Sequence, residues 1–303
     1  MAGITSKYRK ILKGETVKGI LFVLPFAGVW GVFQAWPVIY GFYISLFRWQ
    51  PLLGSEFVGV GNYAHLLRDD RFWNALKNTF WFAGLTLPMI LALGLLFALA
   101  LFGLTGHKGI GIVESTLFWP YLLNVAIVSI IWRWLLDPDF GLVLAYLRGL
   151  GLRPPVFLND PTWALPAIAG ATAWWLAGYR MVVFRAAMED IPETVYELAK
   201  LDGVPPWTFV FRILLPLLKP ALLFAFVLTA ISSFRVLGQV LIMTAGGPGR
   251  ASDVLALYLY EAGWQFFEMG YAAAIGFVLF LLIFLVTLVG LRFFGLGSEL
   301  GEK

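Results

Sequence analysis

The chain has 303 residues, of which 60% are hydrophobic and 13% are charged, and its mean hydropathy is +0.82. Because soluble globular domains carry about 25% charged residues, this composition excludes a water-soluble fold and predicts an all-α integral membrane protein. The net charge of +4 requires no nucleic acid partner, and the absence of cysteine excludes disulfides and thiolate metal sites.

Long apolar segments recur along the whole chain. A transmembrane helix needs roughly 20 mainly apolar residues to cross a hydrocarbon core about 30 Å thick. Segments of this kind predict about six spans, at residues 19–47, 78–103, 113–136, 163–185, 217–244 and 272–294. The spans and their loops use up the sequence, so residues 1–303 are expected to form a single transmembrane domain.

The N-terminal tail, residues 1–18, is rich in lysine and arginine. The apolar run that follows it is too long for the core of a signal peptide and lacks a small-residue cleavage site, so we expect a retained helix. Lysine and arginine are also more frequent in the loops that share a side with this tail. The positive-inside rule therefore predicts a multi-pass protein of the plasma or inner membrane with both termini in the cytoplasm.

Several kinds of chemistry lack their required residues. The sequence has no G-x-x-x-x-G-K-[ST] phosphate loop, so the chain is not expected to bind ATP itself. His65 and His107 fall in loops on opposite sides of the predicted membrane, which argues against a metal site or a catalytic histidine pair. No acidic residue lies clearly inside a predicted span, which argues against an ion-coupled carrier. We therefore predict no catalytic residue, metal or cofactor in this chain.

The loop between the fourth and fifth predicted spans, about 186–216, has the most informative pattern. Pro192 suits the first turn of a helix, and Glu193 complements the positive end of the helix dipole. Asp202 and Gly203 predict the end of that helix. Periodicity alone favours a short amphipathic helix lying on the cytoplasmic membrane surface.

The order of residues in this loop is more specific than its periodicity. The loop contains Ile191-Pro192, Glu197-Leu198-Ala199 and Asp202-Gly203, and it ends at Ile213-Leu214-Leu215-Pro216. This order resembles the coupling loop, I-P-x-x-x-x-E-A-A-x-x-D-G followed by I-x-L-P, of permeases in ATP-binding-cassette importers. The resemblance implies a helix that docks in a groove on the ATPase. The coupling residues that it implies are Ile191, Pro192, Glu193, Glu197, Leu198, Ala199, Asp202 and Gly203.

Further segments extend the resemblance along nearly the whole chain. They read F-V-G-V-G-N-Y at 57–63, F-W-N-A-L-K-N-T at 72–79, T-A-G-G-P at 244–248 and M-G-Y-A-A-A at 269–274. These segments are similar to the first permease of carbohydrate importers of the maltose and glycerol-phosphate type. The resemblance implies the type I, maltose-type importer fold. It also implies four kinds of partner: a homologous second permease, two ATPase subunits that hold ATP and Mg, an extracytoplasmic sugar-binding protein, and membrane lipid.

Polar side chains inside spans are costly in hydrocarbon unless they meet a partner or a water-filled path. In maltose-type permeases the fifth-span helix lines the sugar pathway, and the resemblance implies that some polar residues of this span face the sugar. The substrate-pathway candidates are Asn124, Trp174, Tyr179, Thr229, Ser232, Ser233 and Gln239. Arg133 and Arg180 fall near predicted helix ends, where we expect their side chains to reach the membrane surface.

Together these features predict a membrane-spanning permease subunit of an ATP-driven, binding-protein-dependent sugar importer. Such a subunit forms the translocation pathway with a second permease and performs no covalent chemistry. The alternative from another class is an ion-coupled secondary carrier or channel for small polar solutes.

Overall fold

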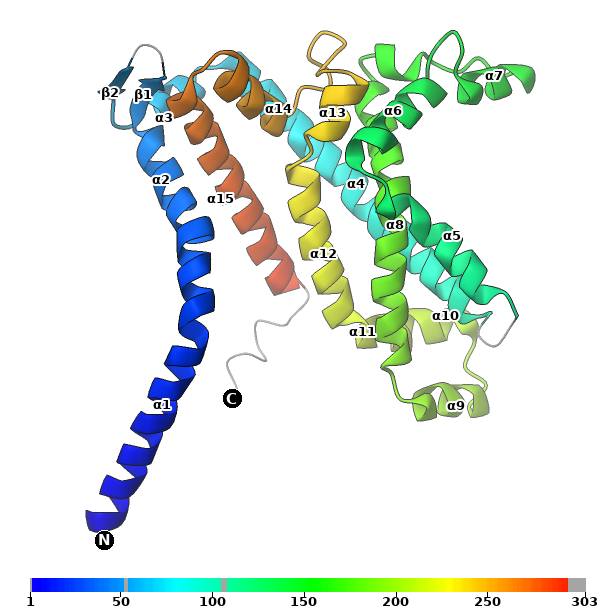
Figure 1. The fold of residues 1–303 in the computed structure, drawn as a ribbon. Helices are drawn as coiled ribbons and strands as arrows, with labels where there is room; N and C mark the ends of the chain where they lie inside the picture. Colours follow the sequence, from blue (N-terminus) through cyan, green and yellow to red (C-terminus); the bar gives the residue numbers. More distant parts are fainter. Residues whose placement is uncertain (1, 52–53, 105–107, 294–303) are drawn as a thin grey trace.

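The computed structural model describes residues 2–51, 54–104 and 108–293, and nearly all of its elements are helices. His107 and residue 294, the last of the sixth predicted span, lie outside this part. The long helices run between two ends of the molecule (Figure 1). One end carries the hairpin β1–β2 together with α3, α7, α13 and α14, and the opposite end carries α9 and α10. We call these the hairpin end and the α9 end.

The first predicted span, 19–47, is confirmed. It is a continuous helical rod made of α1 (Ala2–Trp30), a π-helical turn (Gly31–Ala35) and α2 (Trp36–Ser45). Residues Thr16–Ser45 are long and apolar enough to cross a membrane, and 0% of their most apolar window is buried. This rod therefore presents an apolar surface on nearly all sides.

The second predicted span is confirmed and is longer than expected. The elements after α2 are β1 (Phe47–Gln50), β2 (Gly54–Phe57), α3 (Gly61–Leu66) and α4 (Asp70–Phe102). The strands are antiparallel, with Phe47 opposite Phe57. Helix α4 begins at Asp70 because the side chain of Asp69 accepts a hydrogen bond from the Arg71 N–H at 2.8 Å, which caps the helix.

The third predicted span, 113–136, is interrupted by a sharp bend. This segment forms α5 (Ile110–Leu122) and α6 (Val125–Leu135), which meet at an angle of 98°. Leu123 and Asn124 have extended backbones, which interrupts the helical hydrogen bonds. The Asn124 side chain then accepts a hydrogen bond at 2.9 Å from the N–H two residues on and caps α6.

The fourth predicted span, 163–185, corresponds to α8 (Ala164–Glu189) except for its first residue, Trp163, which is the N-cap of that helix. Helix α8 follows α7 (Leu142–Gly149) and a short 3-10 turn (Phe157–Asn159). A helix of 26 residues is about 39 Å long, which suffices to cross a bilayer. In the described part of the chain, three helices are both long and apolar enough to span, or up to five if each bent pair counts as one. With α8 added, this count is compatible with six.

The fifth predicted span, 217–244, is likewise not one continuous helix. The chain after α8 forms α9 (Glu193–Leu201), α10 (Pro206–Thr208), a π-helical turn (Phe209–Leu214), α11 (Leu215–Leu217), α12 (Lys219–Phe234) and α13 (Gly238–Met243). The helical pattern stops at Arg235, and α13 packs against α6. A Cβ at Gly238 would lie 3.0 Å from the Val125 side chain, so glycine allows this close contact. The two interrupted segments thus meet each other near the hairpin end.

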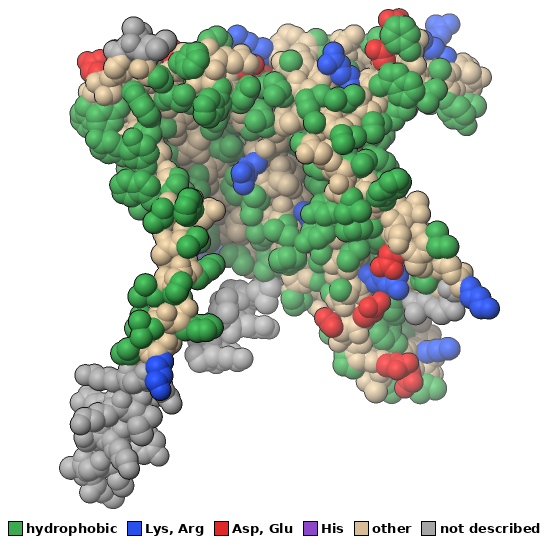
Figure 2. Space-filling view, in the orientation of Figure 1, with side chains coloured by type: hydrophobic (Ala, Val, Ile, Leu, Met, Phe, Trp, Pro, Cys, Tyr) green, Lys and Arg blue, Asp and Glu red, His purple; other side chains and the backbone are tan. Residues whose placement is uncertain are grey.

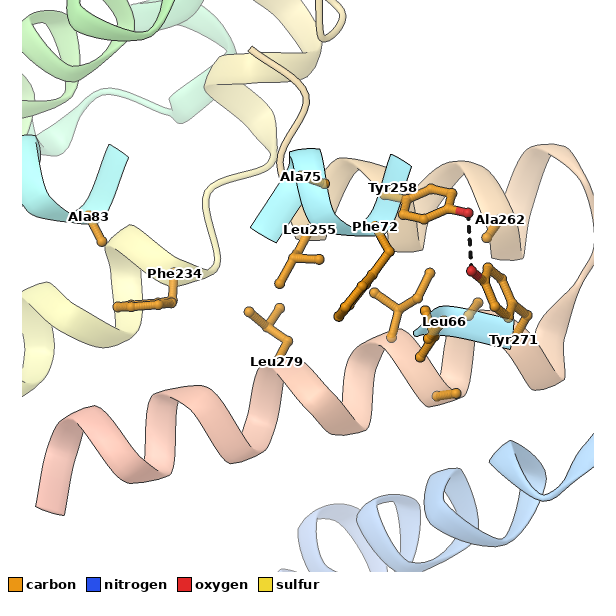
Figure 3. Packing of buried hydrophobic residues seen from close by; sticks show 13 residues of the cluster. Leu66, Phe72, Ala75, Ala83, Phe234, Leu255, Tyr258, Ala262, Tyr271 and Leu279 are labelled. Atoms are coloured by element: carbon orange, nitrogen blue, oxygen red, sulfur yellow. Dashed lines mark hydrogen bonds between the residues drawn. The ribbon is translucent and has the colours of Figure 1, made fainter. Parts of the chain in front are cut away.

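The last elements are α14 (Leu255–Tyr260), a π-helical turn (Glu261–Gln265) and α15 (Met269–Phe293). Helix α15 confirms the sixth predicted span. Side chains of α4, α14 and α15 form one buried cluster, in which Phe72 and Leu255 lie beside Leu279 (Figure 3). This cluster joins α4 to the C-terminal elements α14 and α15.

Small residues bring the central helices close together. A Cβ at Gly94 in α4 would lie 2.5 Å from the Cβ of Arg180 in α8, and one at Gly178 would lie 2.2 Å from the carbonyl oxygen of Leu117. Such close approach is typical of helix packing in membranes. On the face seen in Figure 2, charged side chains gather mainly near the two ends, and hydrophobic side chains cover most of the region between them.

Candidate functional site

The predicted loop helix exists as α9, at the α9 end of the molecule (Figure 1). Pro192 precedes it, Glu193 lies in its first turn, and Asp202 follows its last residue. Gly203 has a φ of +62°, a left-handed conformation that glycine adopts without strain and that reverses the chain after a helix.

One side of α9 is fastened to the long helices. The Tyr196 hydroxyl donates a hydrogen bond to the carbonyl oxygen of Met188, near the end of α8, at 2.8 Å. Its ring lies 5.0 Å from the ring of Phe102 at the end of α4 and 5.6 Å from that of Phe209. Sequence reasoning missed Tyr196, although it sits beside Val195 on the same half-buried side of the helix.

The other side of α9 is open. Leu198 is 59% exposed and Leu201 is 81% exposed, with the exposed acids Glu193 and Glu197 on the same helix. Large apolar side chains that gather at the surface mark interaction sites. Ile191 and Ala199, which the coupling motif also contains, are half-buried. The structure therefore gives α9 one attached side and one free side.

Two polar residues of α12 face neighbouring helices. Thr229 and Ser233 are buried, and the Ser233 hydroxyl accepts a hydrogen bond at 2.8 Å from the Thr86 hydroxyl in α4. The Thr229 hydroxyl accepts one from Nε of Arg180 in α8, also at 2.8 Å. Ser232 is exposed and donates to the Thr229 carbonyl oxygen at 2.9 Å. Thr229 is thus where α12 contacts α8 through polar groups.

The prediction that Arg180 reaches the membrane surface is wrong. Helix α8 continues to Glu189, so Arg180 lies well inside it, and its residue is only 4% exposed. Its guanidinium carbon lies 5.0 Å from the ring centroid of Tyr179. That ring stacks on Tyr121 of α5, with centroids 4.7 Å apart and planes 17° apart. We call Tyr121, Tyr179, Arg180, Thr229 and Ser232 the Arg180 cluster.

Three of the predicted pathway residues, Tyr179, Thr229 and Ser232, therefore come together in the Arg180 cluster. Tyr121 and Arg180, the other two side chains that meet there, were not among the predicted pathway residues. An arginine in an otherwise apolar helix is itself a signal of function. Arg180 was not recognised as such because the fourth span was predicted to end at residue 185, close to it.

The remaining pathway candidates lie elsewhere. Asn124 caps α6, and Trp174 packs edge-on against Trp132 with ring centroids 5.7 Å apart. Gln239 is buried in α13, and Ser233 holds α12 to α4. None of these four side chains hydrogen bonds to the Arg180 cluster within the described residues.

A second polar cluster lies at the hairpin end. Nε of Arg71, in the first turn of α4, donates to Oδ2 of Asp253 at 2.8 Å, and its Nη2 pairs with Glu261. The Asn78 amide donates to the Asp253 carbonyl oxygen at 2.9 Å. Burial raises the pKa of Asp253 against the opposing effect of Arg71. This cluster ties α4 to the segment around α14, and sequence spacing gave no signal of it.

Asp69 extends this cluster toward α15. It accepts hydrogen bonds from the hydroxyls of Tyr271, at 2.6 Å, and of Tyr258. Burial would raise the pKa of Asp69, but the hydrogen bonds from the two tyrosines and from backbone N–H groups hold it below its ordinary value. Burial and the bond to Asp69 raise the pKa of Tyr258 to about 12.

No group of three or more His, Cys, Asp or Glu side chains that could hold a metal ion occurs in residues 2–51, 54–104 and 108–293. The Arg180 cluster and the cluster around Arg71 and Asp69 are held by hydrogen bonds and ion pairs. Their chemistry suits binding and the coupling of helices to one another.

Comparison with known proteins gives a consistent family. A model of the family described as "Binding-protein-dependent transport system inner membrane component" matches residues 58–294. The chain is 31% identical to the lactose transport system permease protein LacF of Rhizobium radiobacter, over 88% of this chain and 90% of that protein. It is 32% identical to the trehalose/maltose transport system permease protein MalF of Thermococcus litoralis, over 94% and 95%.

The fold also matches a solved structure. A chain of a bacterial ABC transporter involved in the import of the acidic polysaccharide alginate superposes with a TM-score of 0.77. The sequences are 24% identical, and the match covers 95% of this chain and 98% of that chain.

Proposed function

Since the chain belongs to the binding-protein-dependent transport system inner membrane component family, we propose that it forms, with a second homologous permease, the translocation pathway of an ATP-driven sugar importer. The names of its relatives, which include lactose and trehalose/maltose systems, support a sugar as cargo. Two ATPase subunits with bound ATP and Mg, and an extracytoplasmic sugar-binding protein, complete the assembly. Membership of this family does not favour the ion-coupled carrier.

The observation that carries this proposal is the two-sided character of α9. The hydrogen bond of Tyr196 attaches one side of α9 to α8. On the other side, Leu198 and Leu201 are exposed. An exposed apolar helix face suits a groove on another protein. The ATPase is the occupant that fits the coupling motif of residues 191–203.

The arrangement of the ends supports the proposed orientation. Helix α1 starts on the side of the molecule that carries α9, and α15 runs from the hairpin end toward that side (Figure 1). If α9 meets a cytoplasmic ATPase, both termini lie in the cytoplasm, as the positive-inside rule predicts. The hairpin end then faces the sugar-binding protein.

The first helix supports the proposed second permease. In Figure 1 the N-terminal part of α1 stands apart from α4, α8 and α12. Because its span is 0% buried, other molecules must cover its apolar sides in the membrane. We assign this role to the second permease and to lipid, and we assign the whole chain, 1–303, to one permease domain.

Transport would follow from two conformations of this domain. Closure of the ATPases on ATP moves α9, and the bond from Tyr196 passes that movement to α8. Helix α8 carries Tyr179 and Arg180, so its displacement changes the contact with Thr229 of α12. ATP thereby favours one state because the ATPases bind the two states unequally.

Reconstitution in liposomes tests the proposal. The expected result is sugar uptake that requires ATP, the second permease, the ATPases and the binding protein, with no uptake by this chain alone. Uptake driven by an ion gradient through this chain alone would overturn the proposal and support the carrier.

A further inference from the structure

The Arg180 guanidinium has no carboxylate partner. Arg180 lies where α8 packs against α4 and α12, since its Cβ would be 2.5 Å from a Cβ at Gly94 of α4 and its Nε bonds to Thr229 of α12. Arg71 and Arg185 behave differently, since each forms ion pairs with two acids. No ion pair involves Arg180 within the part of the chain that the structure describes.

A buried cation without a counter-charge is unfavourable in a membrane protein. Removing a charge from water costs several kcal/mol after relaxation, and uncharged hydrogen bonds recover only part of this. Arginines kept inside spans therefore mark binding sites and transport paths. The helix would be more stable with an apolar residue at this position, so the charge of Arg180 calls for a function.

The guanidinium still has free donors. Its Nε donates to Thr229, and its two Nη atoms have no hydrogen-bond acceptor within the described residues. Two parallel N–H groups of arginine match the two oxygens of a carboxylate, a sulfonate or a phosphate. The stacked rings of Tyr121 and Tyr179 lie beside the guanidinium. The exposed Ser232 hydroxyl lies on α12, the helix that also carries Thr229.

We propose that the transported sugar carries an acidic group, and that Arg180 receives this group as the sugar passes between α8 and α12. This inference rests on the proposed function and narrows its substrate class. Among the described residues, the bond to Thr229 is the one hydrogen bond that joins the guanidinium to α12. Separation of α8 and α12 during transport exposes the fork to the pathway, where the acidic group of the sugar becomes its counter-charge.

A carboxylate on the second permease is a less suitable partner. Arg180 is 4% exposed and enclosed by helices of its own chain, so a side chain from another subunit would have to pass between them. In the proposed mechanism a small solute reaches the guanidinium when α8 and α12 separate, and no side chain of another subunit has to pass between the helices.

Matched sugar pairs test this inference on the purified importer. Binding is measured for glucuronate against glucose, galacturonate against galactose, and glucose 6-phosphate against glucose, each by the rise in the thermal unfolding temperature with concentration. We expect at least one acidic sugar to bind about tenfold or more tightly than its neutral counterpart. In Arg180→Gln that preference should disappear, and in Arg180→Lys it should be reduced.

Arg133→Gln is the matched control, because Arg133 is exposed and its one hydrogen bond within the described residues goes to the Ile242 carbonyl oxygen. This variant should keep the preference of the wild type. The inference is overturned if no acidic sugar binds better than its neutral counterpart, or if the preference survives in Arg180→Gln. It is also overturned if Arg180→Gln releases the second permease, because Arg180 then pairs with that subunit. ATP-driven uptake of a neutral sugar that Arg180→Gln leaves unchanged would refute this inference and leave the proposed function intact.

Discussion

Nε of Arg71 donates to Oδ2 of Asp253 at 2.8 Å and so joins the first turn of α4 to the segment before α14. Both side chains are largely buried, so Arg71→Met would leave a buried carboxylate unpaired. We expect a loss of about 3 kcal/mol in the free energy of unfolding, measured as a lower thermal unfolding temperature in detergent.

Arg48→Met is the control for this change. Arg48 pairs with Glu56 at 3.3 Å, but both side chains are more than two-thirds exposed (68% and 69%). An exposed pair contributes at most about 1 kcal/mol, so this variant should unfold near the wild-type temperature. Equal losses in the two variants would show that the Arg71 pair has no special role.

Asp69 gives the protein a defined response to acid. Its folded pKa lies below its ordinary value of about 3.9, so its bonds to Tyr258 and Tyr271 stabilise the fold above that pH. This contribution is lost as the pH falls through the folded pKa. The wild type should therefore unfold at a higher temperature than Asp69→Asn at pH 6, and the difference should shrink toward pH 3. The raised pKa of Asp253 affects the wild type and Asp69→Asn alike, so its effect cancels in the difference between their unfolding temperatures. A difference that is constant with pH would contradict this role.

The Tyr196 hydroxyl is expected to transmit force from α9. Tyr196→Phe removes the bond to Met188 but keeps the ring beside Phe102 and Phe209. The cost in stability should be about 1 kcal/mol, the usual net value of one hydrogen bond. We expect ATP hydrolysis by the assembled importer to continue with less sugar moved per ATP. An unchanged ratio of sugar to ATP would show that this bond does not carry the coupling.

Gly203 and Gly151 offer a matched pair of backbone positions. Both have positive φ, +62° and +79°, and an added Cβ would meet no atom at either position. Gly203→Asp and Gly151→Asp should therefore cost similar stability, about 1 to 2 kcal/mol, and should leave the spans inserted. Only Gly203→Asp should separate ATP hydrolysis from sugar uptake, because it alone displaces α9. Normal coupling in Gly203→Asp would contradict this role and would support the interpretation of α9 as a helix that lies on the membrane surface.

The sequence predicted those parts of the fold that depend on neighbouring residues. Apolar length identified α4 and α15, and Pro192 and Gly203 marked the two ends of α9. In each case the signal and the structure that it specifies lie within a few residues of each other.

Features that depend on distant residues were missed or wrong. The bend before α6 was missed because hydropathy continues through Asn124, and only the helix cap shows the interruption. Arg180 was misplaced because its partner, Thr229, lies on another helix. The pairing of Arg71 with Asp253 was not predicted because these residues are far apart in the sequence and meet only in the folded chain.

The docking of α9 on an ATPase is the central claim, and co-purification tests it most directly. Leu201 is 81% exposed on α9, and Leu150, beside α7 at the hairpin end, is 60% exposed. We predict that Leu201→Glu loses the ATPase during purification of the complex, whereas Leu150→Glu and the wild type retain it. Full retention of the ATPase by Leu201→Glu and by the double variant Leu198→Glu/Leu201→Glu would contradict the account.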